Sequence, residues 1–133
     1  MATTTPESAL NAKTVSTSLT VNDVQASIRF FEGLGFAIEE KWEKEGTLLG
    51  VMMQAGEAHI GLSQDDWKKG RDRQKGIGVR IYISITQDVD QVAAKAKAAG
   101  ITLDSEPKDM EWGSRAFEVT EPSGFKITIA KDK

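Results

Sequence analysis

The sequence carries one pattern of secondary-structure signals twice, and this duplication limits the folds open to the chain. Residues 14–21 alternate between polar and apolar types, as a strand does, and an amphipathic helical stretch and three more strand-like segments follow them. The same order returns after about 65 residues, so that segments 21–24 and 34–36 are matched by 85–89 and 99–101. The chain is therefore predicted to be an α+β protein built from two tandem βαβββ modules.

Both predicted helices have clear start and stop signals. Asn22 or Asp23 is suited to cap the first helix and Gly35 to end it, while Asp88 and Gly100 play these parts in the second. Neither module closes its own sheet, because each sheet would keep two open edges. We therefore expect the modules to pair into a curved eight-stranded sheet with both helices on the convex face, which leaves the concave face for a ligand.

The chain divides into a tail and one domain. Residues 1–12 are small, polar and without periodicity, which predicts a flexible N-terminal tail. Residues 13–132 are expected to form a single domain, with module one at 14–63 and module two at 77–131. The charged segment 64–76 between them reads as a solvated connection or a short helical turn, and Trp67 inside it is expected to anchor that loop.

Composition excludes several classes of function. The chain has no cysteine, which rules out disulfides, thiolate nucleophiles and cysteine-bound metals. A net charge of −3 and a pI of about 5.2 argue against a nucleic-acid partner. No apolar run approaches the roughly 20 residues that span a bilayer, and the start of the chain lacks a secretory signal. We expect a cytoplasmic protein with no membrane partner.

The second module carries an aromatic and a cation beside a tight turn. The turn 121–124, Glu-Pro-Ser-Gly, joins two predicted strands, since proline presets φ at its second position and glycine permits the last backbone conformation. Trp112 and Arg115 stand just before the first of these strands. The first module has no counterpart of this element, which makes the second module the favoured place for a ligand.

The order of these motifs resembles the vicinal oxygen chelate superfamily, which includes glyoxalase I, extradiol dioxygenases and the fosfomycin and bleomycin resistance proteins. The resemblance covers residues 14–130. Segments 21–23, 27–31 and 34–36 are similar to the superfamily's first helix and its flanks. The turn 121–124 resembles its Asp-Pro-Asp-Gly turn with both acids replaced, and Trp112-Gly113 with Arg115 is similar to its small antibiotic-resistance-like members.

The resemblance also implies where a divalent metal would be held in the superfamily's enzymes. Carried over by register, its ligand positions fall on Ser16, Gly61, Arg80 and Thr128. These residues do not replace histidine and glutamate ligands, and Arg80 brings a fixed positive charge. The chain has one histidine, His59, whereas a zinc site needs several nitrogen or sulfur ligands. We expect no metal and no cofactor, although counting alone leaves an all-carboxylate Mg or Ca site open.

Strand alternation and the aromatic positions give the candidate ligand site. Arg80 alternates with apolar residues that face the helices, which predicts that it points to the concave face, and the alternative is a salt bridge within the sheet. Tyr82, Lys126 and Thr128 share this direction. Trp112 is either a rim residue or a stacking wall, and Arg115 either pairs with a carboxylate such as Glu118 or binds the ligand. The predicted ligand-binding set is Trp112, Arg115, Arg80, Phe117, Trp42, Met52, Tyr82 and Thr128.

Two ligand-dependent functions are consistent with this site, and a regulatory or assembly module with an incidental cleft is a third class of function. The first is a metal-independent binding protein, similar to the bleomycin-resistance-type sequestering proteins, that holds an aromatic or amphipathic small molecule in the concave cleft. The alternative is a glyoxalase-like lyase or isomerase, or a dioxygenase-related enzyme, with a degenerate site and Glu118 as general base. The resemblance further implies a homodimer.

Overall fold

The structure is a computed structural model that describes residues 6–71 and 73–132, and it contains the predicted duplication. The first copy consists of β1 (Thr17–Val21), α1 (Val24–Leu34), β2 (Ala37–Lys44), β3 (Thr47–Ala55) and β4 (Ala58–Gln64). The second consists of β5 (Arg80–Ser84), α2 (Val89–Ala98), β6 (Leu103–Asp109), β7 (Arg115–Thr120) and β8 (Lys126–Lys131). The prediction of an α+β fold with two βαβββ modules is confirmed. None of the described helices is both long and apolar enough to cross a membrane.

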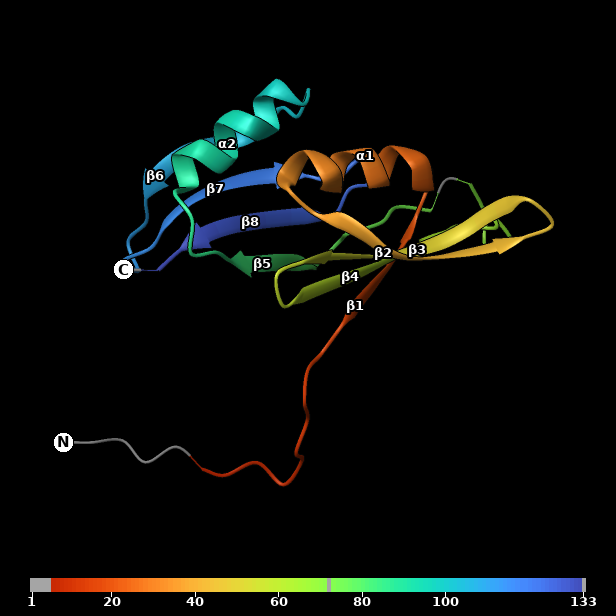
Figure 1. Cartoon of the computed structure of the whole chain (residues 1–133), viewed down its shortest axis with the longest axis horizontal. Helices are drawn as coiled ribbons and strands as arrows, with labels where there is room; N and C mark the ends of the chain where they lie inside the picture. Colours follow the sequence, from red (N-terminus) through yellow and green to blue (C-terminus); the bar gives the residue numbers. More distant parts are fainter. Residues whose placement is uncertain (1–5, 72, 133) are drawn as a thin grey trace.

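Each module forms its own four-stranded sheet, and the two sheets have the same strand order. Sheet A has the order β1-β4-β3-β2 and sheet B the order β5-β8-β7-β6. The first and last strand of each module are parallel neighbours, and the other pairs are antiparallel. Within the described residues no ladder joins sheet A to sheet B, so the eight strands are two sheets and not a continuous one. Both helices lie on the same side of the sheets, α1 over sheet A and α2 over sheet B (Figure 1).

Alternation along the strands separates a buried face from a polar one. The side chains of β8 and β7 that face the helices, among them Ile127, Ile129 and Val119, are almost completely buried in one apolar core with Phe31 of α1. The residues between them point the other way, to the side that carries no helix. We call this side the helix-free face, and it corresponds to the face that the sequence predicted to be concave.

The predicted helix ends are confirmed. The Asp23 carboxylate accepts hydrogen bonds from the backbone N–H groups of Gln25 and Ala26 at 3.0 and 3.3 Å, which satisfies two donors at the start of α1. Gly35 ends that helix with φ of 108°, a conformation that favours glycine. Asp88 caps α2 with one such bond, from the backbone N–H of Asp90 at 2.9 Å. The first strand is shorter than predicted, because β1 begins at Thr17 and the segment before it extends away from the sheets (Figure 1).

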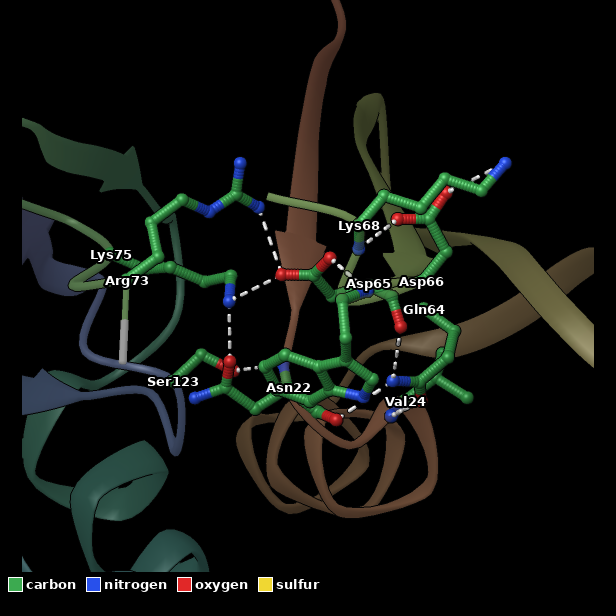
Figure 2. Close-up of polar contacts among 10 residues, drawn as sticks. Asn22, Val24, Gln64, Asp65, Asp66, Lys68, Arg73, Lys75 and Ser123 are labelled. Atoms are coloured by element: carbon green, nitrogen blue, oxygen red, sulfur yellow. Dashed lines mark hydrogen bonds and ion pairs between the residues drawn. The ribbon is translucent and has the colours of Figure 1, made fainter. Parts of the chain in front are cut away.

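The charged connection between the modules folds around one carboxylate. Asp65 is 5% exposed, and its side chain lies 2.8 Å from both the guanidinium of Arg73 and the ammonium of Lys75. The backbone N–H of Trp67 donates to the same carboxylate at 2.9 Å. Figure 2 shows the Arg73 and Lys75 side chains converging on Asp65. The hydrogen bond from Lys75, followed by that from Trp67, lowers the pKa of Asp65 to about 2.

Trp67 contributes to the order of this loop. Lys75 and Arg71 lie over its indole ring, with 4.8 and 4.9 Å between the cationic groups and the ring centroid. The connection is thus a folded, ion-paired segment rather than a solvated linker. The expectation that Trp67 anchors the loop agrees with these contacts.

The turn 121–124 ties the second module to the first. The Ser123 hydroxyl accepts a hydrogen bond from the backbone N–H of Asn22 at 2.8 Å. Glu121 is 1% exposed, and the hydroxyl of Ser27 in α1 donates to its carboxylate. Glu121 and Ser123, which stand where the superfamily's turn has aspartates, therefore have a structural role. They join the end of β7 to the start of α1.

Candidate functional site

The helix-free face of sheet B gathers a cation, a carboxylate and a hydroxyl from three neighbouring strands. Arg80 of β5 donates from Nη1 to Glu118 of β7 at 2.9 Å and to the hydroxyl of Thr128 on β8 at 3.1 Å. The Arg80 side chain is 47% exposed and that of Glu118 is 30% exposed, so solvent reaches the pair. The strand register explains the meeting, because Thr128 lies opposite both Tyr82 and Glu118. The two alternatives predicted for Arg80, a place on the concave face and a salt bridge within the sheet, both hold. Arg80 lies on the helix-free face and forms its salt bridge with Glu118 there.

An aromatic pair lies beside this cluster. The indole Nε1–H of Trp112 and the hydroxyl of Tyr82 are 3.4 Å apart, and the Tyr82 hydroxyl is also 3.4 Å from that of Ser114. Ser114 in turn donates to the Asp132 carboxylate. The loop between β6 and β7 therefore reaches across the sheet to β5. Ala116 and Ala130 share the helix-free face by register and are fully buried, which fits a loop that covers this end of the sheet.

The two aromatic residues nevertheless stay open to solvent. Trp112 is 63% exposed and Tyr82 is 46% exposed. Buried aromatic side chains fill a core, whereas these two keep a large part of their surface open to solvent and are joined by one long hydrogen bond. The arrangement is suited to stack a flat molecule, with Arg80 next to it as a polar partner. Thr128 is 3% exposed, so its hydroxyl holds Arg80 rather than meeting a ligand directly.

Arg115 lies elsewhere, and its predicted place in the cleft is corrected. Its guanidinium binds Asp90 of α2 at 3.0 Å and Asp109 of β6 at 3.2 Å. Arg115 has the same strand parity as the core residues of β7, so its side chain leaves the sheet on the helix side. The bond to Asp90, together with that to Asp109, raises the pKa of Arg115 above its usual value. The salt-bridge alternative is the correct one, with Asp90 and Asp109 in place of Glu118.

Phe117 also departs from the prediction that it walls the cleft. Its side chain is fully buried and belongs to the core beneath the helices. Because neighbouring residues on a strand point to opposite faces, the burial of Phe117 is what turns Glu118 toward the helix-free face. The carboxylate of Glu118 is held by Arg80 there, so it is an ion-paired acceptor and not a free base in this arrangement.

Trp42 and Met52 lie on the corresponding face of sheet A. A Cβ atom added to Gly50 would lie 3.3 Å from the Trp42 ring, and one added to Gly61 would lie 3.7 Å from the Met52 methyl group. Both large side chains thus rest over glycines. Trp42 is 43% exposed and Met52 is half-buried. The structure brings Trp112, Tyr82, Arg80 and Thr128 together on sheet B and places these two on the other sheet.

The positions that the resemblance assigns to metal ligands do not fit a divalent cation. Arg80 occupies one of them and bonds Thr128, which occupies another, so a fixed positive charge lies where the ion would be held. Gly61 offers no side chain, and Ser16 precedes β1. Residues 6–71 and 73–132 contain no cluster of three or more His, Cys, Asp or Glu side chains arranged to bind a metal. His59 pairs with Glu39 on sheet A at 3.4 Å.

A family model matches most of the chain. Residues 13–129 match the model of the Glyoxalase/Bleomycin resistance protein/Dioxygenase superfamily. The chain belongs to this superfamily. Among curated proteins, none matches the sequence significantly.

Several solved structures of similar size share the superfamily fold. A hypothetical protein from S. aureus is 20% identical with a TM-score of 0.70, and the match covers 91% of this chain and 95% of that one. A virulence protein from Salmonella typhimurium is 21% identical with a TM-score of 0.68, covering 93% and 99%. A superfamily member from Sphaerobacter thermophilus is 21% identical with a TM-score of 0.69, covering 92% and 98%. At these identities the likeness establishes the fold alone.

One part of the site, the polar network beyond Tyr82, escaped prediction from the sequence. Ser114 and Asp132 extend the network of Tyr82, and neither carries a pattern that would single it out. Lys126 lies directly across from Arg80 in the β5–β8 ladder, and its strand parity did indicate that it faces the same way.

Proposed function

We propose that this superfamily member binds a flat, aromatic or amphipathic small molecule on the helix-free face of sheet B, without a metal, as a sequestering protein does. One observation carries the proposal: Trp112 and Tyr82 are within hydrogen-bond distance of each other and both exposed to solvent, beside the polar cluster of Arg80, Thr128 and Glu118. Exposed aromatic surface beside a few placed polar groups is the composition of small-molecule sites. The superfamily's bleomycin-resistance branch supplies the precedent for binding without chemistry.

The three tryptophans permit a direct test. In the variant Trp42→Phe/Trp67→Phe, Trp112 is the one remaining indole, so the emission of this variant reports on the proposed wall alone. We expect saturable quenching by naphthamide, naphthoate or bleomycin, whose bithiazole tail is flat. Trp112→Ala in the wild-type background should lower the affinity about five- to tenfold by calorimetry, because the stacking surface is lost.

A matched control is Trp67→Phe, which alters an indole that anchors the connection and lies outside the site. It should bind each probe as the wild type does. If none of the three probes alters Trp112 emission, and Trp112→Ala binds as tightly as the wild type, the proposed site is wrong.

A further inference from the structure

An open pocket of about 490 Å³ lies where the connection enters β5. Its lining includes three cationic residues, Lys75, Arg80 and Lys126, and the glycines Gly76 and Gly78. No carboxylate is among the described residues that line it. A pocket with this lining is suited to a negatively charged group.

The wall of the pocket is fixed backbone. Gly76 has φ of 80°, and a Cβ atom added there would lie 2.3 Å from the carbonyl oxygen of Gly124. Only glycine allows this approach between the connection and the turn 121–124. One wall of the pocket is therefore backbone, and the exposed residues Arg80 and Lys126 from the paired strands β5 and β8 complete the lining.

One of the three cations is already committed. The ammonium of Lys75 lies 2.8 Å from Asp65, also donates to Asn22, and its side chain is 5% exposed. Arg80 and Lys126 are different, because both residues are exposed at the helix-free face. These two are the cations available to a ligand.

Arg80 and Lys126 are directly opposite each other in the parallel ladder of β5 and β8. Like charges that face each other on neighbouring strands repel. One carboxylate, Glu118, pairs with Arg80. Within the described part of the chain, Lys126 forms no ion pair. The pair thus keeps an excess positive charge.

Arg80 has donors to spare. Its bonds to Glu118 and Thr128 both leave from Nη1, whereas a guanidinium carries five N–H groups on three nitrogens. An anion between Nη2 and the Lys126 ammonium would offset the repulsion between the two cations and use these donors.

We propose that this pocket binds the anionic group of the ligand, a carboxylate, sulfonate or phosphate, between Arg80 and Lys126. This inference rests on the proposed function for the flat part of the ligand. Arg80 and Tyr82 are two residues apart on one strand, a separation of about 7 Å. The ligand class is therefore an aromatic acid whose ring lies against Tyr82 and Trp112 while its acidic group enters the pocket.

Inorganic phosphate tests the pocket without any aromatic ring. In a titration followed by amide proton–nitrogen correlation NMR, phosphate should give saturable shifts at Gly76, Gly78, Arg80 and Lys126. Lys126→Gln should weaken this binding about fivefold, as expected for the loss of one partly exposed ion pair. Lys131→Gln removes the same charge from the same strand outside the pocket and should change nothing. Absent or scattered shifts, or equal effects of the two variants, would overturn the proposal.

Naphthoate and naphthamide then separate this inference from the proposed function, because they share a ring and differ in charge. Lys126→Gln should lower the affinity for naphthoate about fivefold and leave that for naphthamide within about twofold. If naphthamide binds through Trp112 and naphthoate binds no more tightly, the anion pocket is wrong and the aromatic site stands. If phosphate binds in the pocket and neither naphthalene compound binds, the aromatic site is wrong and the anion pocket stands.

Discussion

Two clusters, each with two cations and one carboxylate, lie at the two ends of the connection that enters β5, and they differ in burial and in completeness. At Asp65 the carboxylate is buried and receives Arg73, Lys75 and a backbone N–H. At Glu118 the carboxylate is partly exposed and receives Arg80 alone, while Lys126 across the ladder has no partner among the described residues. The two clusters have similar composition and opposite surroundings.

The difference separates a structural cluster from a candidate binding cluster. A buried charge is stable only when its partners are in place, and the Asp65 carboxylate has two cations and a backbone N–H bound to it, which holds the connection together. An exposed cluster contributes little to stability, because water screens it. Spare donors therefore persist at Arg80 and Lys126 at small cost, and they remain available to a ligand.

The largest expected effect follows from removing the buried carboxylate. Asp65→Asn leaves Arg73 and the buried ammonium of Lys75 without their counter-ion, so we expect the melting temperature to fall by about 5–10 °C. Asp66→Asn is the matched control. Asp66 is 63% exposed and lies 3.9 Å from Lys68, so its loss should shift the melting temperature by no more than about 2 °C. Equal shifts in the two variants would show that the cluster at Asp65 does not hold the fold.

The same carboxylate should give the stability a specific dependence on pH. Asp65 has a folded-state pKa of about 2 against an ordinary value of 3.8, so the unfolded chain takes up its proton first as the pH falls. The contribution of Asp65 is fully present above about pH 4 and is lost as the pH falls toward about 2. Thermal unfolding of the wild type and Asp65→Asn between these pH values should show converging melting temperatures. A constant difference would contradict the assignment.

Much of the fold is accessible from the sequence because its signals are local. Asp23, Gly35 and Asp88 mark helix ends through hydrogen bonds within a few residues, and strand alternation separates the core from the helix-free face. Alternation fails where a bulge intervenes. Trp42 would share a face with Ile38 by strict alternation, but register shifts along β2 turn Trp42 to the opposite face.

The candidate site is less accessible because its contacts join distant segments. The placement of Arg80, Tyr82 and Thr128 followed from parity alone. The partners of Arg115 could not be predicted from strand parity, because Asp90 lies on a helix whose rotation over β7 is set by packing. The reach of Trp112 across the sheet to Tyr82 likewise depends on the path of a loop, which no periodic pattern encodes.

The smallest expected effect tests whether Arg80 in the exposed cluster has hydrogen-bond donors left for a ligand, in contrast to the buried cluster at Asp65. Glu118 competes with a ligand anion for Arg80, so Glu118→Gln should raise the affinity for naphthoate about threefold and leave naphthamide unchanged, as measured by calorimetry. Glu106→Gln is the control, because it removes an exposed ion pair with Lys97 away from the site. Weaker naphthoate binding in Glu118→Gln would mean that Arg80 needs Glu118 to be held in place. The Arg80–Glu118 pair would then be a structural salt bridge, like the pairs at Asp65, and Arg80 would not be available to a ligand.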